Sequence, residues 1–355
     1  MDAYRSTKAT VNLGAIRRNT KRILEKYPGY QYYMAVVKAD CYGYRGSQVI
    51  DAMLQAGVNS LAASLVEEGL YLRQLYPELP ILLFTPAHPE TLPLLAEKQL
   101  WTTVATQEQA EAAAQVPGLQ ILIRVNGGCD ILGGPTTRVG FEKIWNTLRS
   151  GKCTLTGIYL HSYNAENPDD TMREYEKFEE LTSGVDLSCL KIISISNSLT
   201  LPRYKKLPCC NACRIGNIVY NIESTDSSFE HTFQLTSQVL SVFSLNKGQS
   251  IAYSRAYTAI QDQERIAVIP IGFGDGFSKT NIGRDVFIHG QRFPIVAVTM
   301  DITLLKIDST VKPNDTVYLI RDNHHLDEIA SHIHGATEES ICALNKRVYR
   351  EYLDN

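Results

Sequence analysis

Short apolar runs alternate with amphipathic segments of helical period between about residues 31 and 220. Each run has the length of a strand, and the segments between the runs are long enough for helices. Eight strand–helix units of this kind are what a closed barrel of parallel strands requires. The eight runs are residues 32–37, 60–64, 81–85, 101–105, 119–125, 155–161, 191–196 and 212–218.

Helices are expected between these runs, for example over residues 65–75, 107–115 and 171–182. A doubly wound open sheet is the competing architecture, but no Gly-x-Gly-x-x-Gly turn follows the first run. We therefore predict an α/β barrel, TIM-like with eight parallel strands. The reactive groups of such a barrel gather at the carboxyl ends of its strands.

After about Ser227 the sequence alternates between apolar and polar residues and is rich in β-formers and turn residues. This texture predicts a barrel domain over residues 1–228 and a mainly β C-terminal domain over residues 229–355. No repeat, low-complexity tract or long linker separates the two, so direct packing is expected. The expected strands are residues 239–245, 251–260, 265–271, 286–288, 295–298, 304–307 and 316–320.

The composition is that of an ordinary globular protein, with 355 residues, 44% of them hydrophobic, and a formal net charge of −3. This charge gives no basic footprint for nucleic acid. No apolar run approaches the roughly 20 residues that span a bilayer, and residues 1–6 lack the apolar core of a signal peptide. We predict a cytoplasmic protein that binds neither nucleic acid nor membrane.

The eight cysteines indicate reduced thiols rather than disulfides, because the sequence shows no export signal. Cys209, Cys210 and Cys213 form one Cys-x-x-Cys cluster that could bind zinc or act in redox chemistry. A structural zinc site needs four ligands, and no second pair of convincing spacing follows, although His332 and His334 lie further along. The sequence favours small buried side chains here, and no metal site is predicted.

Several polar residues fall at or just beyond the ends of the expected strands. They are Lys38, Arg124, His161, Asn197, Ser198 and Gly216. Because the carboxyl ends of parallel strands share one rim, a single pocket could collect all six. A lysine at such a rim can hold a carbonyl cofactor as a Schiff base. From position alone, however, a lysine at a strand end is more often an ion-paired surface residue.

The segment Ala35-Val36-Val37-Lys38-Ala39-Asp40-Cys41-Tyr42-Gly43-Tyr44 resembles, nearly residue for residue, the lysine motif of the alanine racemase family. Members of this family carry pyridoxal 5′-phosphate (PLP). The resemblance extends from Val11-Asn12-Leu13 to Arg347-Val348, with several motifs in the family's order. It implies a homodimer with shared active sites, in which PLP stabilises the charge left when a Cα proton is removed from an amino acid.

The resemblance also implies roles for individual residues. Lys38 would be the Schiff-base lysine and one catalytic base, and Tyr253 of the partner subunit would be the second base. In an unrelated β domain, Tyr253 would be a packing residue. Arg138 and the backbone N–H of Met300 of the partner subunit match the positions that bind the substrate carboxylate. The cofactor-binding matches are Tyr42, Asn197, Ser198, Gly216 and Asn217 around the phosphate, His161 on the pyridine ring and Arg214 at its nitrogen.

The loop after the fifth run departs from the family pattern. The family often carries a lysine, modified to a carbamate, about seven residues before its arginine. Here Arg138 follows Arg124 by 14 residues, so residues 127–137 contain an insertion. A carbamate is anionic and Arg124 is cationic, so the support for Arg138 must differ. Asp130 or a bound anion could supply it.

Three further departures concern the pocket entrance and the tyrosine motif. Phe273 stands where the family commonly has tyrosine, and Lys346 stands where some members have a tyrosine that limits substrate size. Ser254 replaces the glycine that usually follows the catalytic tyrosine, which changes the local backbone freedom. The loss of two hydroxyls and the gain of an amine could admit a larger or more polar amino acid.

The sequence therefore predicts PLP-dependent racemisation of a small α-amino acid, alanine first and serine second, by a two-base mechanism. A racemase for a larger polar amino acid stays open. A PLP-binding carrier without turnover is a second alternative, although single-barrel proteins of that kind lack a β domain. A third is a decarboxylase of the same plan, which generally has a cysteine or another acid in place of the tyrosine motif.

Overall fold

The computed structural model describes residues 4–128, 132–222 and 226–355. The chain forms two compact units, which are described separately below. One unit comprises Arg17–Cys41 and Ile50–Val219, and the other comprises the residues up to Ile16, Tyr42–Val49 and Tyr220–Asn355. The domain boundary expected at residues 228 and 229 stays a prediction.

The first unit contains a sheet of eight parallel strands in the order β8-β7-β6-β5-β4-β3-β2-β9. Its two ends meet, because Arg214 N donates to Ser196 O at 3.0 Å and Asn211 N donates to Ile193 O at 3.1 Å. The predicted barrel and all eight expected strands are confirmed. The strands are β2 (Tyr32–Val36), β3 (Ser60–Ala63), β4 (Ile81–Leu83), β5 (Trp101–Val104), β6 (Gln120–Val125), β7 (Thr154–Leu160), β8 (Ile192–Ser194) and β9 (Ala212–Ile215).

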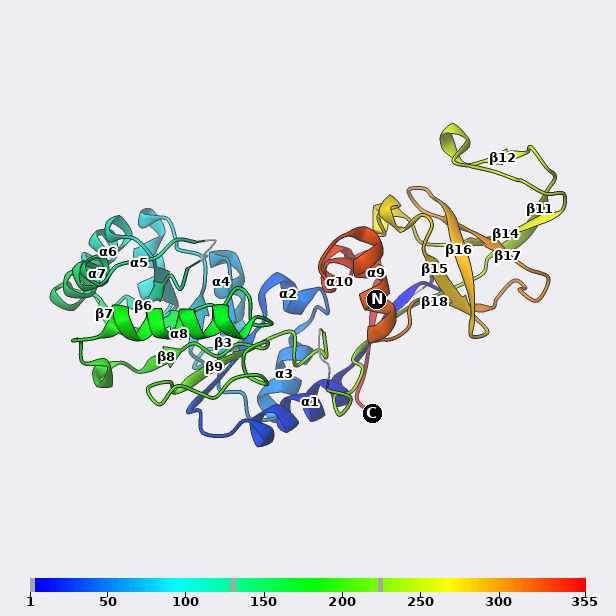
Figure 1. Ribbon diagram of the computed structural model, residues 1–355. Helices are drawn as coiled ribbons and strands as arrows, with labels where there is room; N and C mark the ends of the chain where they lie inside the picture. Colours follow the sequence, from blue (N-terminus) through cyan, green and yellow to red (C-terminus); the bar gives the residue numbers. More distant parts are fainter. Residues whose placement is uncertain (1–3, 129–131, 223–225) are drawn as a thin grey trace. The chain divides into compact units, whose positions relative to one another are not determined.

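Helices follow the strands and lie beside them (Figure 1). Side-chain caps close the first turns of three of them: Thr106 and Thr137 each accept a backbone N–H three residues on, and Asn167 accepts two. The cap at Asn167 starts its helix earlier than expected. The elements are α1 (Leu13–Lys26), which crosses between the units, α3 (Ser47–Gln55), α4 (Val66–Leu75), η1 (Pro89–Thr91), α5 (Leu92–Glu97), α6 (Gln107–Ala114), α7 (Arg138–Ser150), α8 (Pro168–Thr182) and η2 (Leu187–Cys189).

The second unit is built on a nine-stranded sheet in the order β11-β14-β17-β16-β15-β18-β10-β1-β19. Its strands β1 and β19 lie near the two ends of the chain and pair in parallel, from Lys8 opposite Tyr349 to Asn12 opposite Leu353. The strands are β1 (Lys8–Asn12), β10 (Phe233–Gln238), β11 (Ser241–Leu245), β14 (Glu264–Ile269), β15 (Asp285–Ile288), β16 (Gln291–Val298), β17 (Thr303–Ile307), β18 (Thr316–Ile320) and β19 (Tyr349–Leu353). Shorter elements are η4 (Phe273–Asp275), η5 (Lys279–Asn281), α9 (Asn323–Ile333) and α10 (Glu339–Ala343).

The predicted burial of the cysteine cluster holds for two of its three members. Cys210 and Cys213 are buried, whereas Cys209 is exposed, so the prediction is wrong for that residue. Within the described part of the chain, no helix combines the length and the hydropathy that crossing a membrane requires.

His325 on α9 is a buried histidine whose two ring nitrogens are both used. Its Nδ1 accepts the backbone N–H of Arg321 at 3.3 Å, so its Nε2 is the atom that donates, to the carbonyl of Asp285 at 3.3 Å. Phe287 lies edge-on with its ring centroid 4.8 Å away. Burial, followed by the positive charge of Arg284, lowers the pKa of His325 to about 4, so the folded protein holds it neutral at pH 7.

This histidine predicts a specific loss of stability in acid. Between pH 6.5 and about 4 the unfolded chain binds a proton at His325 that the folded chain does not, so stability falls as the pH falls. The contribution is about 2 kcal/mol between pH 7.5 and 5. His325→Gln should remove that part of the loss in urea denaturation, whereas His324→Gln, whose side chain is 80% exposed, should keep it. An equal acid-side loss in the two variants would contradict this assignment.

Candidate active site

Four neighbouring strands present the predicted polar residues at one rim of the barrel. Going around the barrel, β7 is followed by His161, β8 by Asn197 and Ser198, β9 by Gly216 and Asn217, and β2 by Lys38. Because all four strands are parallel, their carboxyl ends lie at the same edge. The structure therefore brings together residues that are far apart in the sequence.

Lys38 is exposed and stands directly before a turn of left-handed backbone. In α2 (Lys38–Tyr42) the φ angles of Ala39, Asp40, Cys41 and Tyr42 lie between 52° and 56°. Each such residue with a side chain costs about 1–2 kcal/mol relative to right-handed backbone. Four in succession are retained only where surrounding contacts impose them, and such turns concentrate at functional sites. Tyr42, the predicted phosphate ligand, is buried and belongs to the second unit.

Glu68 holds this turn, and the sequence analysis did not single it out. Its Oε1 accepts the backbone N–H of Ala39 at 2.6 Å, and its Oε2 accepts those of Ser64 and Leu65 at 2.9 and 3.0 Å. One carboxylate thus ties the residue after Lys38 to the start of α4. A carboxylate with three N–H donors is a strong local clamp because its charge strengthens each bond.

Arg214 is a buried cation inside the barrel, only 3% exposed. Its Nη1 donates to Ser194 O and Oγ at 3.0 and 2.8 Å, and its Nη2 donates to Leu160 O at 2.8 Å. Its guanidinium carbon lies 5.2 Å from the ring centroid of Tyr159. Burial lowers the pKa of Arg214 to about 10, which still leaves it charged at neutral pH.

Side-chain hydrogen bonds shape the loop after β8, and one of them joins it to the loop after β9. Asn197 Oδ1 accepts the backbone N–H groups of Leu199 and Thr200 at 2.9 and 3.0 Å. Ser198 Oγ accepts the N–H of Gly216 at 2.8 Å, which leaves its own O–H to donate. Both predicted residues therefore shape the rim, and the Ser198 hydroxyl is a donor for an anion there.

Arg124 and Arg138 are placed differently from each other. Arg124 is 5% exposed, with its guanidinium carbon 5.7 Å from the ring centroid of Tyr159. The Arg138 side chain is half exposed on the first turn of α7, where its Nε donates to Glu142 Oε1 at 2.7 Å. The support of Arg138 by Asp130 stays a prediction, because Asp130 lies outside the described part of the chain.

Tyr253 lies in a turn, so the strand expected over residues 251–260 is wrong. The segment contains β12 (Ser250–Ile251), η3 (Tyr253–Arg255) and β13 (Tyr257–Thr258). Positive φ angles of 62° at Ala252, 57° at Ser254 and 55° at Arg255 break the strand. A glycine at position 254 would take this backbone without strain, whereas the serine found there has a Cβ and is strained in the same conformation. Tyr253 is 82% exposed, and its hairpin projects beyond the end of the sheet (Figure 1).

The base of this hairpin is fixed by Glu264, which the sequence analysis also missed. The Tyr257 hydroxyl donates to Glu264 Oε2, Lys306 Nζ lies 3.0 Å from that oxygen, and Oε1 accepts the N–H groups of Ile260 and Gln261. The Tyr257 hydrogen bond, together with these donors, lowers the pKa of Glu264 to about 2. A charged anchor therefore holds the strands that carry the exposed tyrosine.

The loop of Met300 packs against the loop of Phe273. Phe273 N donates to Thr299 O and Gly274 N donates to Met300 O, both at 2.9 Å. Within the described residues, no acceptor bonds the N–H of Met300, and the residue as a whole is 55% exposed. A backbone N–H without a protein acceptor is a suitable donor for a carboxylate.

The comparisons with known proteins agree along the whole chain. Family models of the N-terminal and C-terminal domains of alanine racemase match residues 11–224 and 232–352. Alanine racemase 1 of Bacillus subtilis is 30% identical over 99% of this chain and 94% of that protein. The solved structure of alanine racemase from Bacillus anthracis with bound L-Ala-P is 28% identical, with a TM-score of 0.90, and covers 100% of this chain and 97% of that one.

A solved histidine racemase from Leuconostoc mesenteroides subsp. sake has a TM-score of 0.84 and 21% identity, and covers 99% of each chain. At this identity the likeness shows a common fold.

Glu68→Gln tests the clamp on the Lys38 turn. The amide keeps one oxygen acceptor and loses the charge, so the free energy of unfolding should fall by about 1–3 kcal/mol. Amide hydrogen exchange at Ala39 should become faster. Glu67→Gln makes the same charge change at an exposed neighbour and serves as the control. The clamp is refuted if the two variants have the same stability and the same exchange rate at Ala39.

Proposed function

Because the chain belongs to the alanine racemase family, we propose that it interconverts the L and D forms of a small α-amino acid, alanine first and serine second. The proposal includes PLP as the cofactor and a homodimer whose active sites take residues from both subunits. The observation that carries it is the rim where Lys38, His161, Ser198 and Gly216 follow four adjacent parallel strands.

The residues at the rim fit PLP. A dianionic phosphate favours hydroxyls and backbone N–H groups, and the Ser198 hydroxyl keeps a hydrogen to donate. A guanidinium has only donors, so Arg214 would keep the pyridine nitrogen unprotonated. That restricts electron withdrawal into the ring and favours racemisation over side reactions such as transamination. The exposed Lys38 supplies the amine that attaches the cofactor.

The reaction needs proton transfer on both faces of Cα. PLP, when bound, supplies an electron sink that lowers the barrier to removal of the Cα proton. The Lys38 amine exchanges the proton on one face, and the phenol of Tyr253 of the partner subunit exchanges it on the other. Removal on one face with delivery on the other inverts the centre. The exposure of Tyr253 and the projection of its hairpin support a role for this residue in the active site of a second copy of the chain.

The substrate carboxylate would bind to Arg138 and to the backbone N–H of Met300 of the partner subunit. Met300 N–H has no acceptor within the described residues, whereas Arg138 would exchange Glu142 for the substrate. Phe273 is 41% exposed and Lys346 is exposed as well. Because of these two side chains, serine and larger polar amino acids should be tested as substrates beside alanine.

Two substitutions test the assignment of the bases. The purified protein is incubated with L- and D-alanine and with L-serine, and the enantiomers are separated chromatographically. Lys38→Ala should lose the absorbance band of bound PLP and at least about 1,000-fold in activity. Tyr253→Phe should slow the two directions of proton removal unequally, whereas Tyr71→Phe, another exposed tyrosine, should leave both rates unchanged. Full racemisation by Lys38→Ala would refute the proposal.

Mixing the two impaired variants tests the shared active site. If each site takes Lys38 from one subunit and Tyr253 from the other, a hybrid dimer of Lys38→Ala and Tyr253→Phe has one intact site. Random reassociation should then restore about a quarter of the wild-type activity. Each variant mixed with itself is the control. No recovery, with hybrid dimers demonstrated by mass spectrometry, would show that both bases belong to one subunit.

A further inference from the structure

Two loops of the second unit approach each other so closely that only glycine fits between them. A Cβ on Gly272 would lie 2.3 Å from Thr299 O and 2.5 Å from Met300 O, and a Cβ on Gly274 would lie 2.9 Å from Met300 O. The two backbone hydrogen bonds from Phe273 and Gly274 close this contact. The loop at residues 272–276 is thus the support against which the Met300 loop is shaped.

This support fixes the direction of the Met300 N–H. That N–H belongs to the peptide unit whose carbonyl is Thr299 O, and in a trans peptide the N–H and the carbonyl point in opposite directions. Thr299 O faces the N–H of Phe273 at 2.9 Å. The Met300 N–H therefore points away from the supporting loop. Any shift of residues 272–274 would turn the donor.

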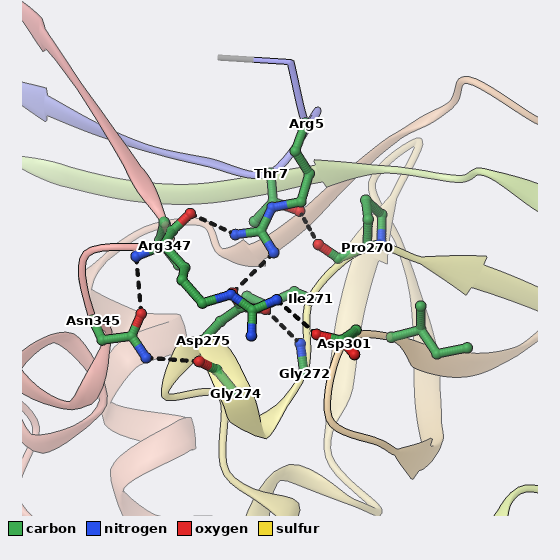
Figure 2. A network of polar contacts seen from close by, with 12 residues as sticks. Arg5, Thr7, Pro270, Ile271, Gly272, Gly274, Asp275, Asp301, Asn345 and Arg347 are labelled. Atoms are coloured by element: carbon green, nitrogen blue, oxygen red, sulfur yellow. Dashed lines mark hydrogen bonds and ion pairs between the residues drawn. The ribbon is translucent and has the colours of Figure 1, made fainter. Parts of the chain in front are cut away.

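Ion pairs with a buried carboxylate hold the supporting loop (Figure 2). Asp275 is fully buried, and its Oδ2 accepts the N–H of Gly272 at 3.0 Å. Its Oδ1 lies 2.9 Å from Arg5 Nη1 and 3.2 Å from Arg347 Nε. A buried carboxylate bound by two cations and a backbone N–H is well compensated where it stands, and removing one of these partners leaves a buried charge less well compensated.

Arg347 joins the two loops. Besides Asp275, its Nη2 donates to Asp301 Oδ1 at 2.6 Å, next to Met300 in the chain (Figure 2). Asn345 secures the arginine's backbone, since its Oδ1 accepts Arg347 N at 2.9 Å and its Nδ2 donates to Gly274 O at 2.7 Å. Arg5, by contrast, donates to Asp275 and to the carbonyl of Arg347, and no hydrogen bond or ion pair joins it to residues 299–301 within the described part of the chain.

We propose that Asp275 and Arg347 are positioning residues that aim the Met300 N–H at the substrate carboxylate. This inference rests on the proposed function, because it assigns that N–H to the carboxylate of an amino acid. Neither side chain touches the reacting atoms. Their effect passes through the Gly272–Thr299 contact on one side and through Asp301 on the other.

Arg347→Gln and Asp275→Asn test the proposal in the PLP-loaded enzyme. Both should raise KM for alanine about tenfold and leave kcat and the PLP absorbance band nearly unchanged. The inhibition constant of propionate, a carboxylate without an amino group, should rise by the same factor. Arg347→Lys keeps a cation that reaches one carboxylate and should recover part of the loss. Arg5→Gln is the matched control, because it removes a cation from Asp275 but not the link to Asp301.

The outcomes separate the two proposals. If Arg5→Gln shares the loss of melting temperature but keeps the wild-type KM, the positioning role stands. If Arg5→Gln, Arg347→Gln and Asp275→Asn lose stability alike with KM and propionate inhibition unchanged, the network is only structural and the inference falls. Should Asp275→Asn fail to fold, the Arg347→Lys and Arg347→Gln pair decides. A wild-type enzyme that racemises no amino acid would instead refute the proposed function itself.

Discussion

The parallel pairing of neighbouring barrel strands is the constraint on which the candidate site depends. Each parallel pair keeps its carboxyl ends level, so a residue placed just after any strand reaches the same rim. The contact between β8 and β9, made by Ser196 with Arg214 and by Ile193 with Asn211, closes the ring at this point. Without it, the residues after β7 and β8 would lie at one edge of an open sheet, with those after β2 and β9 at the other.

Local clamps then hold conformations that the backbone does not prefer. Glu68 at the Lys38 turn and Glu264 at the Tyr253 hairpin both stabilise their segments by accepting backbone N–H groups. Each carboxylate accepts backbone N–H groups from a segment that contains or adjoins residues with positive φ. Asp275 repeats the pattern at Gly272. At the Lys38 turn and at the Tyr253 hairpin, the charged acceptor supplies stabilisation that offsets the cost of residues with positive φ.

Much of this arrangement could be predicted from the sequence, and the failures have physical causes. The eight barrel strands carry continuous apolar runs, which is the signal that burial on both faces leaves. Strands β1, β10 and β19 were missed because their identity depends on partners hundreds of residues away. Glu68 and Glu264 were missed because a carboxylate on a helix or strand looks like a surface charge until its N–H partners are known. The positive φ at Ser254 could not be expected from a residue that seldom adopts it.

The parallel pairing of β1 with β19 has a consequence for how the protein forms on the ribosome. The second unit takes residues from the beginning, from Tyr42–Val49 and from the last third of the chain. Its sheet leaves β1 with an unpaired edge until Tyr349–Leu353 have been synthesised. An unpaired edge is a template for association with other nascent chains. Because β19 is synthesised after the other strands of this sheet, the sheet cannot be completed before then, and a chain truncated before Tyr349 would leave this edge of β1 unpaired.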